Sequence, residues 1–117
     1  MSRVPAGCCF KQILHYIQSY KTNLFSQFDY GLRENLRRYG KRNAPEYPLE
    51  IVKTPVAIHH THNDWLANVE NIERLARSLP NVVQRVLYPD KTWNHVRLLY
   101  GDNVTDVMFP EILRVLK

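Results

Sequence analysis

The pattern of apolar and polar positions along the chain predicts three helices. In the first, apolar residues recur every three or four positions after Pro5: Phe10, Ile13, Leu14 and Ile17. This spacing predicts an amphipathic helix over residues 6–21. The same period returns after Asn68, a candidate N-cap, and stops before Pro80. The stretch 103–117 predicts a final helix in which Asn103 or Thr105 is the cap and Pro110 is a kink.

Two short apolar runs rich in β-branched residues predict strands. The first is "PVAIHH", residues 55–60, and the second is "NVVQRVLYP", residues 81–89. Strand, helix, strand and helix in this order are typical of a parallel βαβ unit in an α/β protein. Because a parallel sheet of two strands leaves its faces and edges poorly covered, the pattern also indicates that more sheet belongs upstream.

The first half of the chain has a less regular pattern. The aromatic-rich "TNLFSQFDYG" is expected to be irregular, and residues 43–55, "NAPEYPLEIVKTP", contain three prolines and predict an extended linker. An apolar share of 44% over 117 residues is typical of one small globular domain and not of a disordered chain. No apolar run is long enough to predict a transmembrane helix, and "MSRVPAGCCFKQ" lacks the apolar core of a signal peptide.

The basic residues behind the net charge of +5 are concentrated in one stretch. Residues 32–43 hold five of them: Arg33, Arg37, Arg38, Lys41 and Arg42. Such a cluster can meet the phosphates of nucleic acid or of lipid headgroups, and the plain alternative is a solvated loop. No nucleic-acid-binding motif accompanies the cluster, so we expect no nucleic-acid partner.

Polar residues follow each predicted strand. Asp64 lies in the loop "THND" after the first strand, and His95 lies in "KTWNH" after the second. In open parallel sheets functional groups gather just past the carboxyl ends of the strands, so adjacent strands would bring both side chains to one edge. An aspartate that accepts a hydrogen bond from imidazole Nδ1–H stabilises the imidazolium. Asp64 and His95 are therefore candidate acid and base of a triad, in the chain order that α/β-hydrolases use, although many domains have such a pair by chance.

The histidines at the end of the first strand raise a second hypothesis. His60 and His62 are two positions apart and would share a face of an extended strand, where they could hold zinc with Asp64 as a third ligand. A strong zinc signature would add a separated pair of Cys or His, and nothing marks such a pair here. We therefore expect no metal, with His59 and His60 at the end of the strand and His62 in a solvated loop.

Short motifs occur in order along nearly the whole chain. They are "PAG", "LHYIQ", "FDYG", "PEYPLEIVKTPVAI", "NDWLA", "LPNVV" and "NH", within residues 3–117. In this order and spacing they resemble the C-terminal part of the acid lipases, the lysosomal and gastric lipase family of α/β-hydrolases, especially its insect members. The resemblance implies an α/β class and an incomplete α/β-hydrolase fold. Residues 1–48 would end the helical lid, or cap, and residues 49–117 would be the C-terminal core segment, a parallel βαβ unit plus a terminal helix.

The same resemblance implies roles for individual residues and for partners. Asp64 would be the triad acid and His95 the triad base, with no cofactor and no metal. The substrate of the complete enzyme would be an ester of a neutral lipid, met with transient contact to a lipid surface. The family is lysosomal or secreted, whereas the chain as written carries no signal peptide.

The chain lacks the nucleophile that such a triad needs. A serine hydrolase of this fold carries its serine in a G-x-S-x-G turn between a strand and a helix. None of the serines has that context: Ser2, Ser19, Ser26 and Ser78. We therefore expect the isolated chain to be inactive, because losing the nucleophile costs about a million-fold in turnover. The alternative is a non-catalytic interaction module or a truncated product, and a third class is a basic binder of nucleic acid or of a membrane surface.

The adjacent Cys8 and Cys9 do not fill this gap. "AGCCF" lacks the second glycine of a nucleophile turn and follows no predicted strand. Neighbouring cysteines are also too close for a relaxed disulfide. We expect both to be small buried side chains on the first helix.

Overall fold

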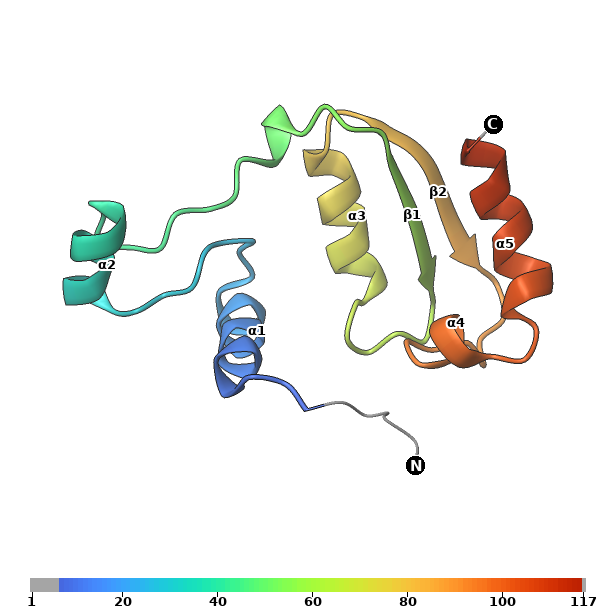
Figure 1. Cartoon of the computed structure of the whole chain (residues 1–117), viewed down its shortest axis with the longest axis horizontal. Coiled ribbons are helices and arrows are strands. Elements are labelled where there is room, and N and C mark those ends of the chain that lie inside the picture. Colours follow the sequence, from blue (N-terminus) through green and yellow to red (C-terminus); the bar gives the residue numbers. More distant parts are fainter. Residues whose placement is uncertain (1–6, 117) are drawn as a thin grey trace. The chain divides into compact units, whose positions relative to one another are not determined.

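The computed structural model describes residues 7–116, which divide into two compact units. The first unit ends at Tyr47 and the second begins at Pro48 (Figure 1). Pro5, expected near the first helix start, lies outside the described residues, as does Lys117. The assignment of residues 1–48 to a lid and of residues 49–117 to a core stays a prediction. Among the described residues, no helix combines the length and apolar character needed to cross a membrane.

Two helices joined by an irregular segment form the first unit. α1 spans Phe10–Thr22 and α2 spans Leu32–Tyr39 (Figure 1). α1 begins at residue 10 and not at the predicted residue 6, since the backbone N–H of Cys9 is capped by the Gln12 side chain at 3.0 Å. The basic stretch forms α2, which the apolar pattern does not predict. The carboxylate of Glu34 pairs with the guanidinium groups three and four positions later and supports this short helix.

Asn35 on α2 holds the irregular segment of the first unit in place. Its side chain is 1% exposed, and its Nδ2 donates to Asp29 Oδ1 at 2.7 Å and to the carbonyl oxygen of Arg42 at 3.0 Å. Its Oδ1 accepts from the backbone N–H of Tyr30 at 3.0 Å. No apolar side chain among the described residues of this unit is fully buried. Among the described residues of this unit, the fully buried side chain is therefore polar, whereas most small domains bury apolar side chains.

A βαβ arrangement followed by two helices forms the second unit. After a 3₁₀ turn, η1, at Leu49–Ile51, the elements are β1 Val56–Thr61, α3 Val69–Ser78, β2 Val82–Tyr88, α4 Arg97–Tyr100 and α5 Val104–Val115 (Figure 1). β1 pairs in parallel with β2, from Val56 opposite Val82 to Thr61 opposite Tyr88. The predicted mixed α/β class and two-stranded parallel sheet are confirmed.

α3 and α5 cover opposite faces of this sheet. Arg85 on β2 binds Glu73 of α3, whereas its neighbour Gln84 binds Glu111 of α5. Successive strand residues point to opposite faces, so the two helices pack on different sides, as Figure 1 shows. The helix boundaries agree with the capping prediction, since Asn68 Oδ1 accepts from the backbone N–H at the third position of α3 at 2.9 Å.

The hydrophobic core lies between the sheet and the helices α4 and α5. Tyr88, Trp93 and Val104 are its buried members, and partly buried apolar residues pack against them: Val86, Leu98 and Met108. Pro110 lies in the interior of α5, which continues through it.

Two sequence expectations about side-chain burial are wrong. Cys8 and Cys9 are exposed, because α1 begins after them and they do not lie within the helix. In the sequence Trp65 and Trp93 flank Asp64 and His95, which predicts that both pack their loops, but Trp65 is 77% exposed while Trp93 is 1% exposed. The loop after β1 turns Trp65 outward, whereas the loop after β2 folds Trp93 back onto the core.

Asn35→Ala should destabilise the first unit by about 1–3 kcal/mol, because it removes the three hydrogen bonds that the buried Asn35 side chain makes. Native-state hydrogen exchange of the amides of α1 and α2 would measure this loss. Asn43→Ala is the matched control, since Asn43 is exposed in the same unit. Equal exchange rates in the two variants would contradict the role given to Asn35.

Candidate functional site

Asp64 and His95 extend from the loops that follow β1 and β2. The parallel ladder ends at the pair Thr61 and Tyr88, so both loops leave the sheet at the same edge (Figure 1). There His95 Nδ1 lies 2.9 Å from Asp64 Oδ2. The structure therefore brings together two candidate residues that are 31 positions apart in the chain.

Asp64 is a buried carboxylate, and both of its oxygens accept hydrogen bonds. Its residue is 5% exposed, and its Oδ1 accepts from the backbone N–H groups of Leu66 at 2.9 Å and Ala67 at 2.8 Å. Burial by itself raises the pKa of Asp64, but the hydrogen bonds from Ala67, His95 and Leu66 together hold that pKa below its usual value of 3.8. The carboxyl group is therefore ionised at neutral pH and remains so in mild acid.

His95 combines a fixed nitrogen with an accessible one. Its side chain is 43% exposed. When Nδ1 carries the proton that the carboxylate of Asp64 accepts, Nε2 keeps a lone pair directed away from Asp64. This arrangement can take up a proton at Nε2 and stabilise the resulting imidazolium through Asp64.

The loop that carries His95 is held on both sides of the imidazole. Trp93, two positions earlier, is buried in the core, and its backbone N–H donates to the carbonyl oxygen of Asp90 at 3.0 Å. Asn94 Oδ1 accepts from the backbone N–H of Arg97 at 2.9 Å and so joins the loop to the start of α4.

The histidines of β1 do not gather around a common point. β1 runs through Thr61, with His60 buried at 3% exposure and His62 exposed beyond the strand. Burial lowers the pKa of His60, which favours its neutral form. No group of three metal-binding side chains comes together among residues 7–116. The structure therefore offers no support for the zinc alternative within this range.

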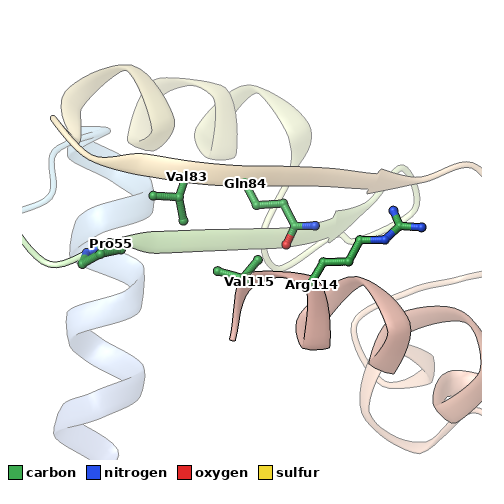
Figure 2. A pocket seen from close by; sticks show the side chains of 5 residues that line it. All are labelled: Pro55, Val83, Gln84, Arg114 and Val115. Atoms are coloured by element: carbon green, nitrogen blue, oxygen red, sulfur yellow. The ribbon is translucent and has the colours of Figure 1, made fainter. Parts of the chain in front are cut away.

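An open pocket of about 450 Å³ lies at the other end of the strands. Figure 2 shows the side chains that line it: Pro55, Val83, Gln84, Arg114 and Val115. Pro55 precedes β1 and Val83 is near the start of β2, whereas Asp64 and His95 follow the strand ends. This pocket therefore does not contain the candidate site.

Sequence reasoning misses the donors that hold Asp64. They are backbone N–H groups two and three residues later, and the side chains at those positions give no indication of this role. The available signal is the aspartate itself, since Asp at the start of a turn commonly accepts from the backbone that follows.

A buried carboxylate that orients a half-exposed imidazole, on loops that follow parallel strands, is an arrangement in which the imidazole can act as a base. Comparison with known proteins indicates the class of protein. The chain is 33% identical over 110 residues to Lipase 3 of Drosophila melanogaster, covering 94% of this chain and 28% of that protein. It is 30% identical over 116 residues to Lipase 1 of the same organism, covering 99% and 26%.

Vertebrate relatives extend this likeness. Gastric triacylglycerol lipase of Bos taurus is 27% identical over 113 residues, covering 96% of this chain and 28% of that protein. No family model matches the chain. The chain spans roughly a quarter of the length of these relatives. The chain is thus homologous over nearly its whole length to lipases of the lysosomal, gastric and insect kinds, and the predicted resemblance to acid lipases is confirmed.

Asp64→Asn should weaken the pH dependence of the free energy of unfolding of the second unit in the acid range. Because the folded-state pKa of Asp64 is lowered, its contribution is fully present above the unfolded-state pKa. That contribution is lost as the pH falls below the unfolded-state pKa and through the lower folded-state pKa. Urea unfolding at a series of pH values would measure the change. Asp102→Asn, at an exposed position, should leave the slope as in the parent, and an unchanged slope in Asp64→Asn would refute the assignment.

Proposed function

We propose that this chain supplies the acid and the base of a Ser–His–Asp triad to a lipase of the acid-lipase kind. The observation that carries the proposal is the 2.9 Å contact between His95 Nδ1 and the buried carboxylate of Asp64. In this proposal the second unit is the last part of an α/β-hydrolase core, and residues 1–48 end the lid above the acyl pocket. The remaining strands would come from the larger share of the enzyme, since the relatives are much longer.

The chemistry follows from the two nitrogens of His95. A serine from elsewhere in the enzyme would attack the ester carbonyl carbon while His95 Nε2 takes the hydroxyl proton. Asp64 would stabilise the imidazolium through the Nδ1–H bond. His95 would then give the proton to the departing alcohol and leave an acyl-enzyme. Water, deprotonated by the same nitrogen, would release the fatty acid and restore the serine.

Neutral lipid esters are the substrate class that the relatives support. Their names include gastric triacylglycerol lipase and lysosomal acid lipase/cholesteryl ester hydrolase. In the first unit, the exposed Leu32 and Leu36 of α2 lie beside the positions of Arg33 and Arg37. This mixture of apolar and cationic groups is suited to transient contact with a lipid surface. No cofactor or metal takes part in this scheme.

The isolated 117-residue chain should not hydrolyse esters. Of its described serines, Ser19 lies within α1, Ser78 ends α3 and Ser26 forms an isolated bridge, whereas a nucleophile of this fold follows a strand. Turnover of p-nitrophenyl butyrate and of emulsified triacylglycerol should fall about a million-fold or more below that of a complete lipase. Hydrolysis by the chain that His95→Ala abolishes would show that it carries its own nucleophile.

A chimaera tests the triad roles directly. The segment of Drosophila melanogaster Lipase 3 that matches this chain would be replaced by the chain itself, and ester hydrolysis would be measured. We expect activity that His95→Ala lowers by about a thousand-fold or more and Asp64→Asn by about a hundred-fold or more, because each removes part of the proton relay.

His62→Ala is the matched control for this chimaera. His62 is exposed in the same loop as Asp64, and its removal should change turnover by less than about two-fold, as is usual for a surface site. A chimaera that melts cooperatively, shows the parent circular dichroism and yet has no activity would contradict the proposal. So would equal losses in His62→Ala and His95→Ala.

A further inference from the structure

A second histidine, on β1, contacts a residue at the end of β2, the strand that precedes the His95 loop. His59 on β1 and Tyr88 at the end of β2 share the sheet face that α5 covers, and His59 Nδ1 lies 2.8 Å from the Tyr88 hydroxyl oxygen. Their rings are stacked, with centroids 5.9 Å apart and planes 23° apart. His59 is paired in register with Val86, so its contact with Tyr88 runs diagonally toward the edge that carries the candidate site.

Burial favours the neutral form of both partners of this contact. Tyr88 is 3% exposed, and burial raises the pKa of its hydroxyl group. Burial also lowers the pKa of His59, while the carboxylate of Glu111 on α5 acts in the opposite direction. A neutral imidazole can accept from the Tyr88 hydroxyl at Nδ1. Such a bond has fixed direction and little exchange with water, so it restrains both side chains.

Tyr88 also packs against Trp93, which lies in the loop that carries His95. Its ring lies 5.2 Å from the Trp93 ring, and Trp93 is fully enclosed in the core at 1% exposure. Trp93 is two positions before His95, while β1 leads directly to Asp64. The set His59, Tyr88 and Trp93 therefore connects the strand of the acid to the loop of the base, through the residue of β2 that forms the last pair of the sheet ladder.

We propose, on the basis of the proposed function, that His59 and Tyr88 are positioning residues that set the separation of Asp64 and His95. The hydroxyl–imidazole bond ties the end of β2 to β1 on the α5 face, and Trp93 carries that position to His95. Without the bond, the two loops would sample a wider range of separations. Errors of about 1 Å in the placement of a catalytic group cost up to about a hundred-fold in rate.

The decisive variants keep the packing and remove the hydrogen bond. Tyr88→Phe retains the ring and loses the hydroxyl group, and in the lipase chimaera it should lower kcat by about ten-fold while KM changes by less than about two-fold. His59→Leu should have a similar effect. His59→Asn should recover most of the activity, because its side-chain oxygen can accept near the position of Nδ1. The double variant His59→Leu/Tyr88→Phe should be no worse than either single change.

Tyr39→Phe is the matched control. The Tyr39 hydroxyl donates to the carbonyl oxygen of Phe28 at 3.0 Å in the first unit, so this change removes a comparable hydrogen bond elsewhere. If loss of stability alone lowered activity, Tyr39→Phe and Tyr88→Phe would reduce kcat equally at equal melting temperature. That result would overturn the proposal, as would an unchanged kcat in Tyr88→Phe or a failure of His59→Asn to exceed His59→Leu.

Proton NMR of the 117-residue chain separates this inference from the proposed function. The Nδ1 proton that His95 shares with Asp64 should appear as an exchange-protected imidazole signal, absent in Asp64→Asn. It should broaden or vanish in Tyr88→Phe and persist in Tyr39→Phe. An inactive parent chimaera together with this NMR pattern would reject the lipase role and keep the positioning role. An unaltered signal in Tyr88→Phe would reject the positioning role alone.

Discussion

The parallel pairing of β1 with β2 is the constraint on which the candidate site depends. Because both strands run in the same direction, the loops after Thr61 and Tyr88 leave at one edge, and distant residues meet there. A shift of the pairing by one residue would turn each side chain of β2 to the other face. Tyr88 would then leave the core that it forms with Trp93. Register, core packing and the distance from Asp64 to His95 are thus set together.

The buried charge of Asp64 explains why its loop has a definite shape. A carboxylate without hydrogen bonds is very costly to bury. Here two backbone N–H groups and an imidazole share its two oxygens. The backbone N–H groups that bind Oδ1 of Asp64 also orient its Oδ2 toward His95. The local turn and the candidate chemistry therefore have one physical cause.

Different interactions stabilise the interior of each of the two units. The second unit has buried aromatic and aliphatic side chains around Tyr88, Trp93 and Val104. The first unit relies on the hydrogen bonds of Asn35 and on the cation of Lys11 above the rings of Phe28 and Tyr30, at 4.8 and 4.3 Å from their centroids. A unit whose described residues include no buried apolar side chain is marginal on its own, which fits a segment whose relatives are much longer proteins.

The sequence by itself determined the order of elements in the second half, the capping of α3 by Asn68, and the candidacy of Asp64 and His95. These follow from local rules of periodicity, capping and loop position, which need no knowledge of distant residues. It did not determine α2, because that helix has too few apolar residues to show a period and is supported by charge pairs. Nor did it distinguish Trp93 from Trp65, or exposed cysteines from buried ones. Those outcomes, like the bond between His59 and Tyr88, depend on which segments lie opposite each other, and only the tertiary structure decides that.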